Sequence, residues 1–260
     1  MSFSPRTLGR TGLMASRLGL AAGYGIGAAG VERAFERGVN YFYWGSRRRE
    51  SFGRGLRNLA RRRDQFILVI QSYSRLASLL SWSLERALRE LQMDYADVLL
   101  LGLWNRPPPP RIVDACRRLV ERGRVRFLAV STHHRPLAPR LAADPGWGVL
   151  HVRYNAAHTG AELDIFPHLP AANPPGMVCY TATRWGQLLD PRRTPPGERT
   201  PSAADSYRFV LSHPAVDVCL SGPADDRQLD EGLEALRRGP MTEEELAWMR
   251  RVGRAVYPRS

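Results

Sequence analysis

The sequence alternates short apolar runs with amphipathic segments, and this alternation constrains the fold more than any other feature. The clearest amphipathic segment places Leu80, Leu84, Ala87, Leu88 and Leu91 on one face of a helix. Buried strands separated by helices are typical of a parallel sheet with crossover helices. Eight such units in 260 residues predict an α/β protein with a closed (β/α)₈ TIM barrel. The eight predicted strands are residues 17–20, 39–43, 66–70, 97–101, 125–130, 148–152, 177–180 and 216–220.

Signals for the ends of helices agree with a single barrel domain over residues 1–260. Gly38 and Gly123 each follow a predicted helix, where a left-handed residue commonly ends it. Thr242 and Glu245 have the spacing of a capping box and predict the start of the last helix.

The composition excludes several chemistries. All 38 basic residues are arginine, so no lysine is available for a Schiff base, a pyridoxal phosphate anchor or a phosphate-binding loop. The net charge of +13 would attract anionic partners. Because the arginines are spread over nearly every segment, we expect a solvated surface and no nucleic-acid partner.

The spacing of the cysteines, the spacing of possible metal ligands and the length of the apolar stretches exclude further kinds of site. Cys116, Cys179 and Cys219 have no CxxC spacing, so we predict neither a disulfide framework nor a zinc site, and we expect a cytoplasmic protein. No metal site is predicted, since no His, Asp and Glu set has ligand spacing. The apolar stretch 18–30 is too short to span a bilayer, so no membrane partner is expected. Residues 190–203, rich in Pro, Arg and Thr, predict a mobile loop over one barrel mouth.

Short motifs along almost the whole chain follow the order found in one known family. They are residues 8–13, 16–20, 38–42, 95–100, 123–126, 130–131, 154–155, 179–181, 212–214 and 221–223. Together they resemble the aldo-keto reductase superfamily. The resemblance implies a TIM barrel with an N-terminal hairpin and a C-terminal helix, and NAD(P)H-dependent reduction of a carbonyl substrate.

The resemblance implies a rebuilt catalytic centre. The family places an aspartate, a tyrosine, a lysine and a histidine at the barrel mouth, and the tyrosine protonates the carbonyl. Here Tyr43 matches the aspartate, Gln71 the lysine and Gly102 the histidine, while the loop expected to carry the tyrosine holds residues 46–49, Ser-Arg-Arg-Arg. We predict that Tyr43 donates a hydrogen bond or proton, that Gln71 orients it, and that His133 or a loop arginine assists. The alternative for Tyr43 is an aromatic plug in the space that Gly102 leaves.

The resemblance also implies a site for NADP or NAD. The matching positions are Ser131, Thr132 and His151 for the nicotinamide carboxamide, Tyr180 and Thr181 at the stacked ring, and Gly222, Arg227, Gln228 and Glu231 on the adenosine side. Ala224 stands where the family usually grips the 2′-phosphate with a basic residue, and Asp225 adds a negative charge. We therefore expect weak binding with little preference for the 2′-phosphate, with no binding as the alternative.

Residues after the third to sixth predicted strands are candidates for contacts with a small-molecule substrate. They are Tyr73, Trp104, Asn105, Arg153 and Asn155. The polar run that begins at Arg153 suggests that an anion or the substrate is held there, and a structural ion pair between Arg153 and Glu162 is the alternative. Packing of exposed loops is the alternative for Tyr73 and Trp104.

Three functions are compatible with this sequence. The first is a divergent oxidoreductase acting on a small carbonyl compound. A protein that binds a nucleotide or another protein without catalysis is the second, because every position of the catalytic tetrad is changed. The third is a non-redox lyase or isomerase that uses Tyr43 and His133. Fold alone does not choose between them.

Overall fold

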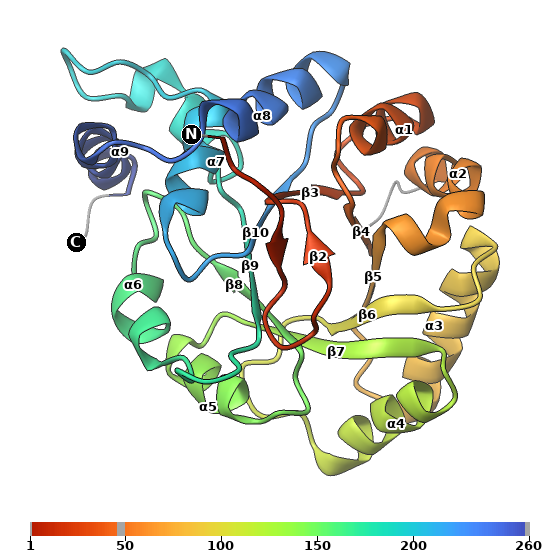
Figure 1. Cartoon of the computed structure of the whole chain (residues 1–260). Helices are drawn as coiled ribbons and strands as arrows, with labels where there is room; N and C mark the ends of the chain where they lie inside the picture. The colour runs from red at the N-terminus through yellow and green to blue at the C-terminus, as the bar shows by residue number, and fades with distance from the viewer. Residues whose placement is uncertain (1, 46–49, 258–260) are drawn as a thin grey trace.

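The computed structural model describes residues 2–45 and 50–257, and in these the chain forms a closed barrel of eight parallel strands (Figure 1). The strands follow one another around the barrel in chain order, and the last one pairs with the first. This arrangement confirms the predicted (β/α)₈ fold. The barrel strands are β3 (Leu18–Ala21), β4 (Tyr41–Trp44), β5 (Ile67–Ser72), β6 (Ala96–Leu101), β7 (Val125–Thr132), β8 (Val149–Arg153), β9 (Gly176–Tyr180) and β10 (Val218–Ser221).

Helices surround the barrel on its outside (Figure 1). They are α1 (Ala28–Glu36), α2 (Glu50–Asn58), α3 (Ala77–Leu91), α4 (Pro110–Glu121), α5 (Ala138–Ala143), α6 (Ala161–Asp164), α7 (Ala203–Ser212), α8 (Asp226–Arg238) and α9 (Glu243–Val256). The predicted helix ends are confirmed, since Gly38 and Gly123 have φ of +87° and +68°. The capping box of Thr242 and Glu245 opens α9, the predicted C-terminal helix.

Alternation of side chains along the strands produces two separate cores. Inward-facing side chains fill the barrel, and they include Tyr41, Val69, Val98, Val149 and Val178. The side chains between them face outward and pack against the helices in a second, larger core. Burial on both faces explains why the strands read as continuous apolar runs.

A two-stranded hairpin lies across one end of the barrel (Figure 1). Its strands are β1 (Arg6–Thr7) and β2 (Met14–Ala15), and they pair antiparallel. Leu8 and Ala15 from this hairpin are fully buried within the inner core. The predicted N-terminal hairpin therefore closes the barrel at the N-terminal ends of its strands, and we refer to this end as the closed end.

Charged residues at the closed end are paired with one another. Asp97, at the start of β6, is 2% exposed and accepts a hydrogen bond from the backbone amide of Leu68 at 2.9 Å. Its carboxylate also pairs with Arg63 at 2.6 Å and with Arg126 at 2.9 Å. The starts of three adjacent strands are thus joined through one buried carboxylate.

Residues 190–203 do not lie over the barrel mouth as predicted. The segment runs along α9 at the edge of the barrel (Figure 1). The indole nitrogen of Trp248 in α9 donates to the carbonyl of Arg199 at 3.1 Å, and the guanidinium of Arg199 lies 3.9 Å from the centre of that indole ring. Glu198 pairs with Arg251 of the same helix. Polar and aromatic contacts with α9, which composition does not reveal, therefore fix its position.

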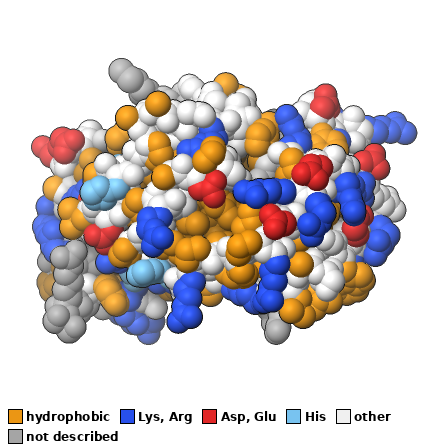
Figure 2. Space-filling model, turned by 90° about the horizontal axis from the view of Figure 1, so that it is seen from below, with side chains coloured by type: hydrophobic (Ala, Val, Ile, Leu, Met, Phe, Trp, Pro, Cys, Tyr) orange, Lys and Arg blue, Asp and Glu red, His pale blue; other side chains and the backbone are white. Residues whose placement is uncertain are grey.

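The surface carries interspersed charges of both signs. On the face in Figure 2, arginine side chains alternate with acidic ones around an apolar centre. Among the described residues, no helix combines the length and the apolar character needed to cross a bilayer. Nor does the described part of the chain contain a group of three His, Cys, Asp or Glu side chains placed to hold a metal ion.

Candidate active site

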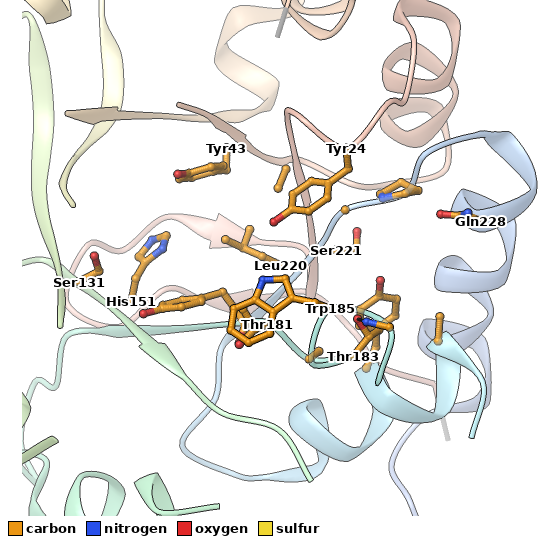
Figure 3. A pocket seen from close by; sticks show the side chains of 18 of the residues that line it. Tyr24, Tyr43, Ser131, His151, Thr181, Thr183, Trp185, Leu220, Ser221 and Gln228 are labelled. Carbon is orange, nitrogen blue, oxygen red and sulfur yellow. Dashed lines mark hydrogen bonds between the residues drawn. The ribbon is translucent and has the colours of Figure 1, made fainter. Parts of the chain in front are cut away.

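A cavity of about 760 Å³ opens at the C-terminal ends of the strands, opposite the hairpin. It extends from Ser131 and His151 at the barrel mouth to Gln228 in the first turn of α8 (Figure 3). Its volume is within the range of small-molecule sites. Active sites of TIM-barrel enzymes lie at this end of the barrel. The cavity is therefore the candidate active site.

Tyr43 of β4 and Gln71 of β5 line the mouth of the cavity. The phenol of Tyr43 donates a hydrogen bond to Oε1 of Gln71, as the sequence predicts for this pair. Burial raises the pKa of Tyr43, and the nearby phenols of Tyr73 and Tyr24 raise it further. Tyr43 is therefore a weaker acid than a free tyrosine, although its hydroxyl remains a hydrogen-bond donor.

The space beside Gly102 is filled by Tyr73 and Gln71. A Cβ atom at Gly102 would lie 2.5 Å from Nε2 of Gln71 and 2.6 Å from Cε1 of Tyr73. Tyr73 therefore fills the space next to Gly102, and a role for Tyr43 as an aromatic plug stays a prediction. The arginines at 47–49, considered as a source of positive charge, lie outside the described residues.

His133 and Arg153 lie close together on another side of the mouth. Nη2 of Arg153 is 3.3 Å from Nε2 of His133. Because a guanidinium only donates hydrogen bonds, Nε2 is the acceptor and the neutral ring carries its proton on Nδ1. Burial, followed by the charge of Arg153, lowers the pKa of His133. His133 is therefore neutral at pH 7 and offers a donor without a charge.

Arg153 does not pair with Glu162, so that structural alternative is wrong. Glu162 accepts a hydrogen bond from the phenol of Tyr154 at 2.6 Å and pairs with Arg250 at 2.9 Å. The guanidinium of Arg153 instead faces the ring of Trp185, 5.3 Å from its centre. The carboxylate that spacing suggested for Arg153 is taken by a residue of α9.

The turn after β9 holds strained backbone beside the cavity. Thr181, Arg184 and Trp185 have φ of +59°, +51° and +53°, a region that costs non-glycine residues roughly 1–2 kcal/mol each. Arg184 anchors the turn by donating to the carbonyl of Val256, and its guanidinium lies 4.4 Å from the ring centre of Tyr257. The turn presents Trp185, 61% exposed, at the cavity (Figure 3). Strain of this kind is often found at ligand sites.

Three predicted nicotinamide contacts line the inner end of the cavity: Ser131, His151 and Tyr180. The hydroxyl oxygen of Ser131 accepts from the backbone amide of Leu103 at 2.8 Å, which leaves its own proton available to a ligand. Nε2 of His151 is hydrogen-bonded to the phenol of Tyr41 at 2.9 Å, so only Nδ1 is available. Burial lowers the pKa of His151 to about 3, and the ring is therefore neutral.

The outer end of the cavity is lined by Gly222, Arg227, Gln228 and Glu231, all predicted on the adenosine side. Oε1 of Gln228 accepts a backbone amide of the loop before α8, which leaves its NH₂ group for a ligand. Glu231 accepts the first amide of α7. The ring of Tyr24 packs on Gly222, where a Cβ atom would lie 2.5 Å from it.

Several predicted contact residues do not line the cavity. They are Thr132, Trp104, Asn105, Arg153 and Asn155. Asn155 is fully buried and donates to the carbonyl of Thr181 at 2.8 Å. Asn105 accepts the amide of His133 at 2.9 Å. In this structure these two side chains support the loops around the mouth instead of forming its wall.

One prominent aromatic residue of the cavity, Tyr24, was missed from the sequence. It stands between Gly23 and Gly25 and follows the barrel strand β3, where loops form the mouth. A large aromatic in a glycine-rich turn after such a strand was the signal available.

Comparisons with known proteins agree with the fold. No family model matches the chain. L-galactose dehydrogenase from Arabidopsis thaliana is 26% identical over 216 residues, which cover 71% of this chain and 59% of that protein, less than two thirds of its length. The aldo-keto reductase AKR11C1 from Bacillus halodurans superposes with a TM-score of 0.78 in its holo form at 18% identity, and 0.77 in its apo form at 19% identity. Each superposition covers 98% of both chains.

These comparisons define the class of structure. The chain has the fold of an aldo-keto reductase, as its sequence motifs predict. It is also similar in sequence to L-galactose dehydrogenase.

Proposed function

We propose that this protein is a dinucleotide-dependent oxidoreductase that acts on a small carbonyl compound. The observation that carries the proposal is the continuous cavity from Ser131 and Tyr180 at the mouth to Arg227 and Gln228 at α8. These are positions at which the resemblance to aldo-keto reductases implies contacts with the two halves of NAD(P). The shared fold supports the same reading.

The side chains along the cavity fit a dinucleotide. Ser131 offers a hydroxyl proton at the inner end, and Arg227 and Gln228 offer donors at the outer end. A dinucleotide bound there would supply or accept hydride at the mouth. Asp225 caps α8 by accepting the amide of Gln228, so a carboxylate occupies the helix start that would otherwise attract phosphate. We infer weak binding with little preference for the 2′-phosphate.

Reduction of a carbonyl also needs a hydrogen-bond or proton donor. Tyr43 has a hydroxyl at the mouth, and Gln71 fixes its orientation. Its raised pKa makes proton transfer slow, since the family's nearby cation is replaced by a neutral amide. His133 offers a second donor through Nδ1.

One observation favours a noncatalytic nucleotide-binding protein as the second candidate. The proton of Tyr43 is donated to Gln71, so it is not available to a substrate while this hydrogen bond lasts. The lyase or isomerase alternative is less well supported, because Nε2 of His133 is engaged by Arg153 and is not free to act as a base.

The test is oxidation of NADH and NADPH with a panel of aldehydes, ketones and imines. We expect slow turnover with at least one of them. Saturable dinucleotide binding without turnover of any compound would contradict catalysis and favour the noncatalytic candidate. A catalytic protein without dinucleotide binding would contradict the redox assignment.

A further inference from the structure

Arg153 does not itself line the cavity, but it contacts two residues that do, His133 and Trp185, and most of its hydrogen-bond donors are unused. It ends β8, two residues beyond His151, so alternation directs both side chains to the barrel axis. Its Nε is buried and has no hydrogen-bond partner. Among the described residues its one side-chain hydrogen bond joins Nη2 to Nε2 of His133, although a guanidinium has five N–H donors.

No carboxylate of the described residues lies within 4 Å of this guanidinium. Glu162, the carboxylate that the spacing in the sequence suggested, pairs with Arg250 instead. Arg17, which is also partly buried and has no carboxylate partner in the described part of the chain, differs from Arg153 because it donates to three backbone carbonyls. Still other arginines pair with a carboxylate. Arg63, for example, pairs with Asp97 at 2.6 Å. Removing a cation from water without a counter-ion is costly, so proteins usually pair such groups. An unpaired guanidinium next to the lining of a ligand cavity is therefore available to an anion brought by the ligand.

The surroundings of Arg153 leave its charge uncompensated. His133 is neutral, and burial raises the pKa of the Tyr180 phenol, so neither group supplies a negative charge at pH 7. Trp185 covers one face of the guanidinium, at a distance typical of a cation–π contact. These contacts fix the plane of the group while leaving Nη1 free to donate. A fixed guanidinium suits the two parallel hydrogen bonds that a carboxylate or phosphate accepts.

We propose that Arg153 forms an anion-binding subsite for a carboxylate or phosphate group carried by the substrate. The substrate assignment rests on the proposed function, whereas anion binding does not. The aromatic wall of Tyr24, Tyr73 and Trp185 makes an aromatic acid the appropriate probe. The pyrophosphate of the dinucleotide is the other source of such an anion, and the experiment separates the two.

The experiment measures binding of benzoate and of NADH to the full chain by calorimetry. The wild-type protein is compared with Arg153→Gln, and with Arg153→Lys, which keeps the charge. Arg135→Gln is the matched control, because Arg135 is exposed and already pairs with Asp164. We expect Arg153→Gln to bind benzoate at least about tenfold more weakly, Arg153→Lys to retain part of the affinity, and the control to match the wild type.

Two outcomes would overturn the subsite. One is benzoate affinity unchanged in Arg153→Gln, and the other is no binding of benzoate by the wild type at millimolar concentration. If Arg153→Gln weakens NADH binding alone, the anion belongs to the dinucleotide and the substrate assignment fails.

An activity assay tests the proposal through the reaction. We expect the ratio of kcat/KM for 4-carboxybenzaldehyde to that for benzaldehyde to fall at least about tenfold in Arg153→Gln. An unchanged ratio would contradict a substrate anion at Arg153. A wild type that reduces neither aldehyde would count against the proposed function, while the benzoate titration still decides the anion subsite.

Discussion

The closed end and the mouth of the barrel both contain charged side chains, but they differ in whether these have partners of opposite charge. At the closed end, Asp97 is buried against Arg63 and Arg126, and its hydrogen bonds are satisfied within the protein. At the mouth, Arg153 has no acidic partner among the described residues. A buried charge network whose hydrogen bonds are all made within the protein stabilises the fold, whereas unused donors beside a cavity can bind a ligand. We therefore assign a stabilising role to the closed end and a ligand-binding role to the mouth.

The largest expected effect is at the closed end. Replacing Asp97 with alanine would leave Arg63 and Arg126 without their counter-ion and the amide of Leu68 without its acceptor. We expect Asp97→Ala to lower the free energy of unfolding by about 3–5 kcal/mol. Urea denaturation measures this, and Asp97→Asn, which keeps an acceptor oxygen, should lose less. A loss below about 1 kcal/mol would contradict a stabilising role for Asp97 at the closed end.

The next effect is at the mouth and concerns activity. Tyr43→Phe keeps the ring and removes only the hydroxyl that donates to Gln71. We expect turnover to fall at least about tenfold, while the free energy of unfolding changes by no more than about 1.5 kcal/mol. Steady-state kinetics and urea denaturation together check this. Full activity in the variant would show that Tyr43 is not the donor, and a parallel assay of His133→Ala would test the remaining one.

Histidines near the mouth make stability depend on pH. The pKa of His151 is about 3 in the folded protein and 6.5 when unperturbed, so the unfolded chain binds more protons between these values. Stability is therefore present above pH 6.5 and is lost as the pH falls. One such histidine contributes a slope of up to about 1.4 kcal/mol per pH unit. We expect the free energy of unfolding, measured by urea denaturation, to decline less steeply between pH 6.5 and 5 in His151→Gln than in the wild type. Equal slopes in the two proteins would contradict this.

The smallest expected effect on stability comes from the strained turn. Trp185 has a left-handed φ and is mostly exposed, so Trp185→Gly removes roughly 1 kcal/mol of strain and little packing. We expect the free energy of unfolding to stay the same or to rise by no more than about 1 kcal/mol, because glycine also increases the freedom of the unfolded chain, which offsets part of the relieved strain. Benzoate affinity should fall in the same variant. A large loss of stability in thermal denaturation would show that the turn stabilises the fold, and would contradict a role in ligand binding alone.

The sequence predicted the interior of the barrel much better than its mouth. Val69, Val98 and Val149 follow from alternation and apolar runs, because each strand must bury the same face. The Tyr43 and Gln71 pair followed from residues at the ends of adjacent strands. The position of Tyr73 beside Gly102 did not, because loops after the strands are not constrained by this periodicity.

The ion-pair partners of charged residues could also not be predicted from the sequence. Glu162 lies nine positions from Arg153 but pairs with Arg250 of α9, far away in the chain. Spacing along a strand and its loop cannot show which distant helix returns to the same place. The lack of a carboxylate partner for Arg153 therefore follows from the position of α9, which the sequence does not show.

Titration of the purified protein with NADH and NADPH tests whether the mouth and the groove toward α8 form a dinucleotide site. Calorimetry and nucleotide fluorescence report binding without requiring turnover. We predict saturable binding of both, with affinities that differ by less than about tenfold, because Asp225 offsets the attraction of Arg227 for a 2′-phosphate. The absence of any heat or spectral change at millimolar dinucleotide would contradict a dinucleotide site in this cavity.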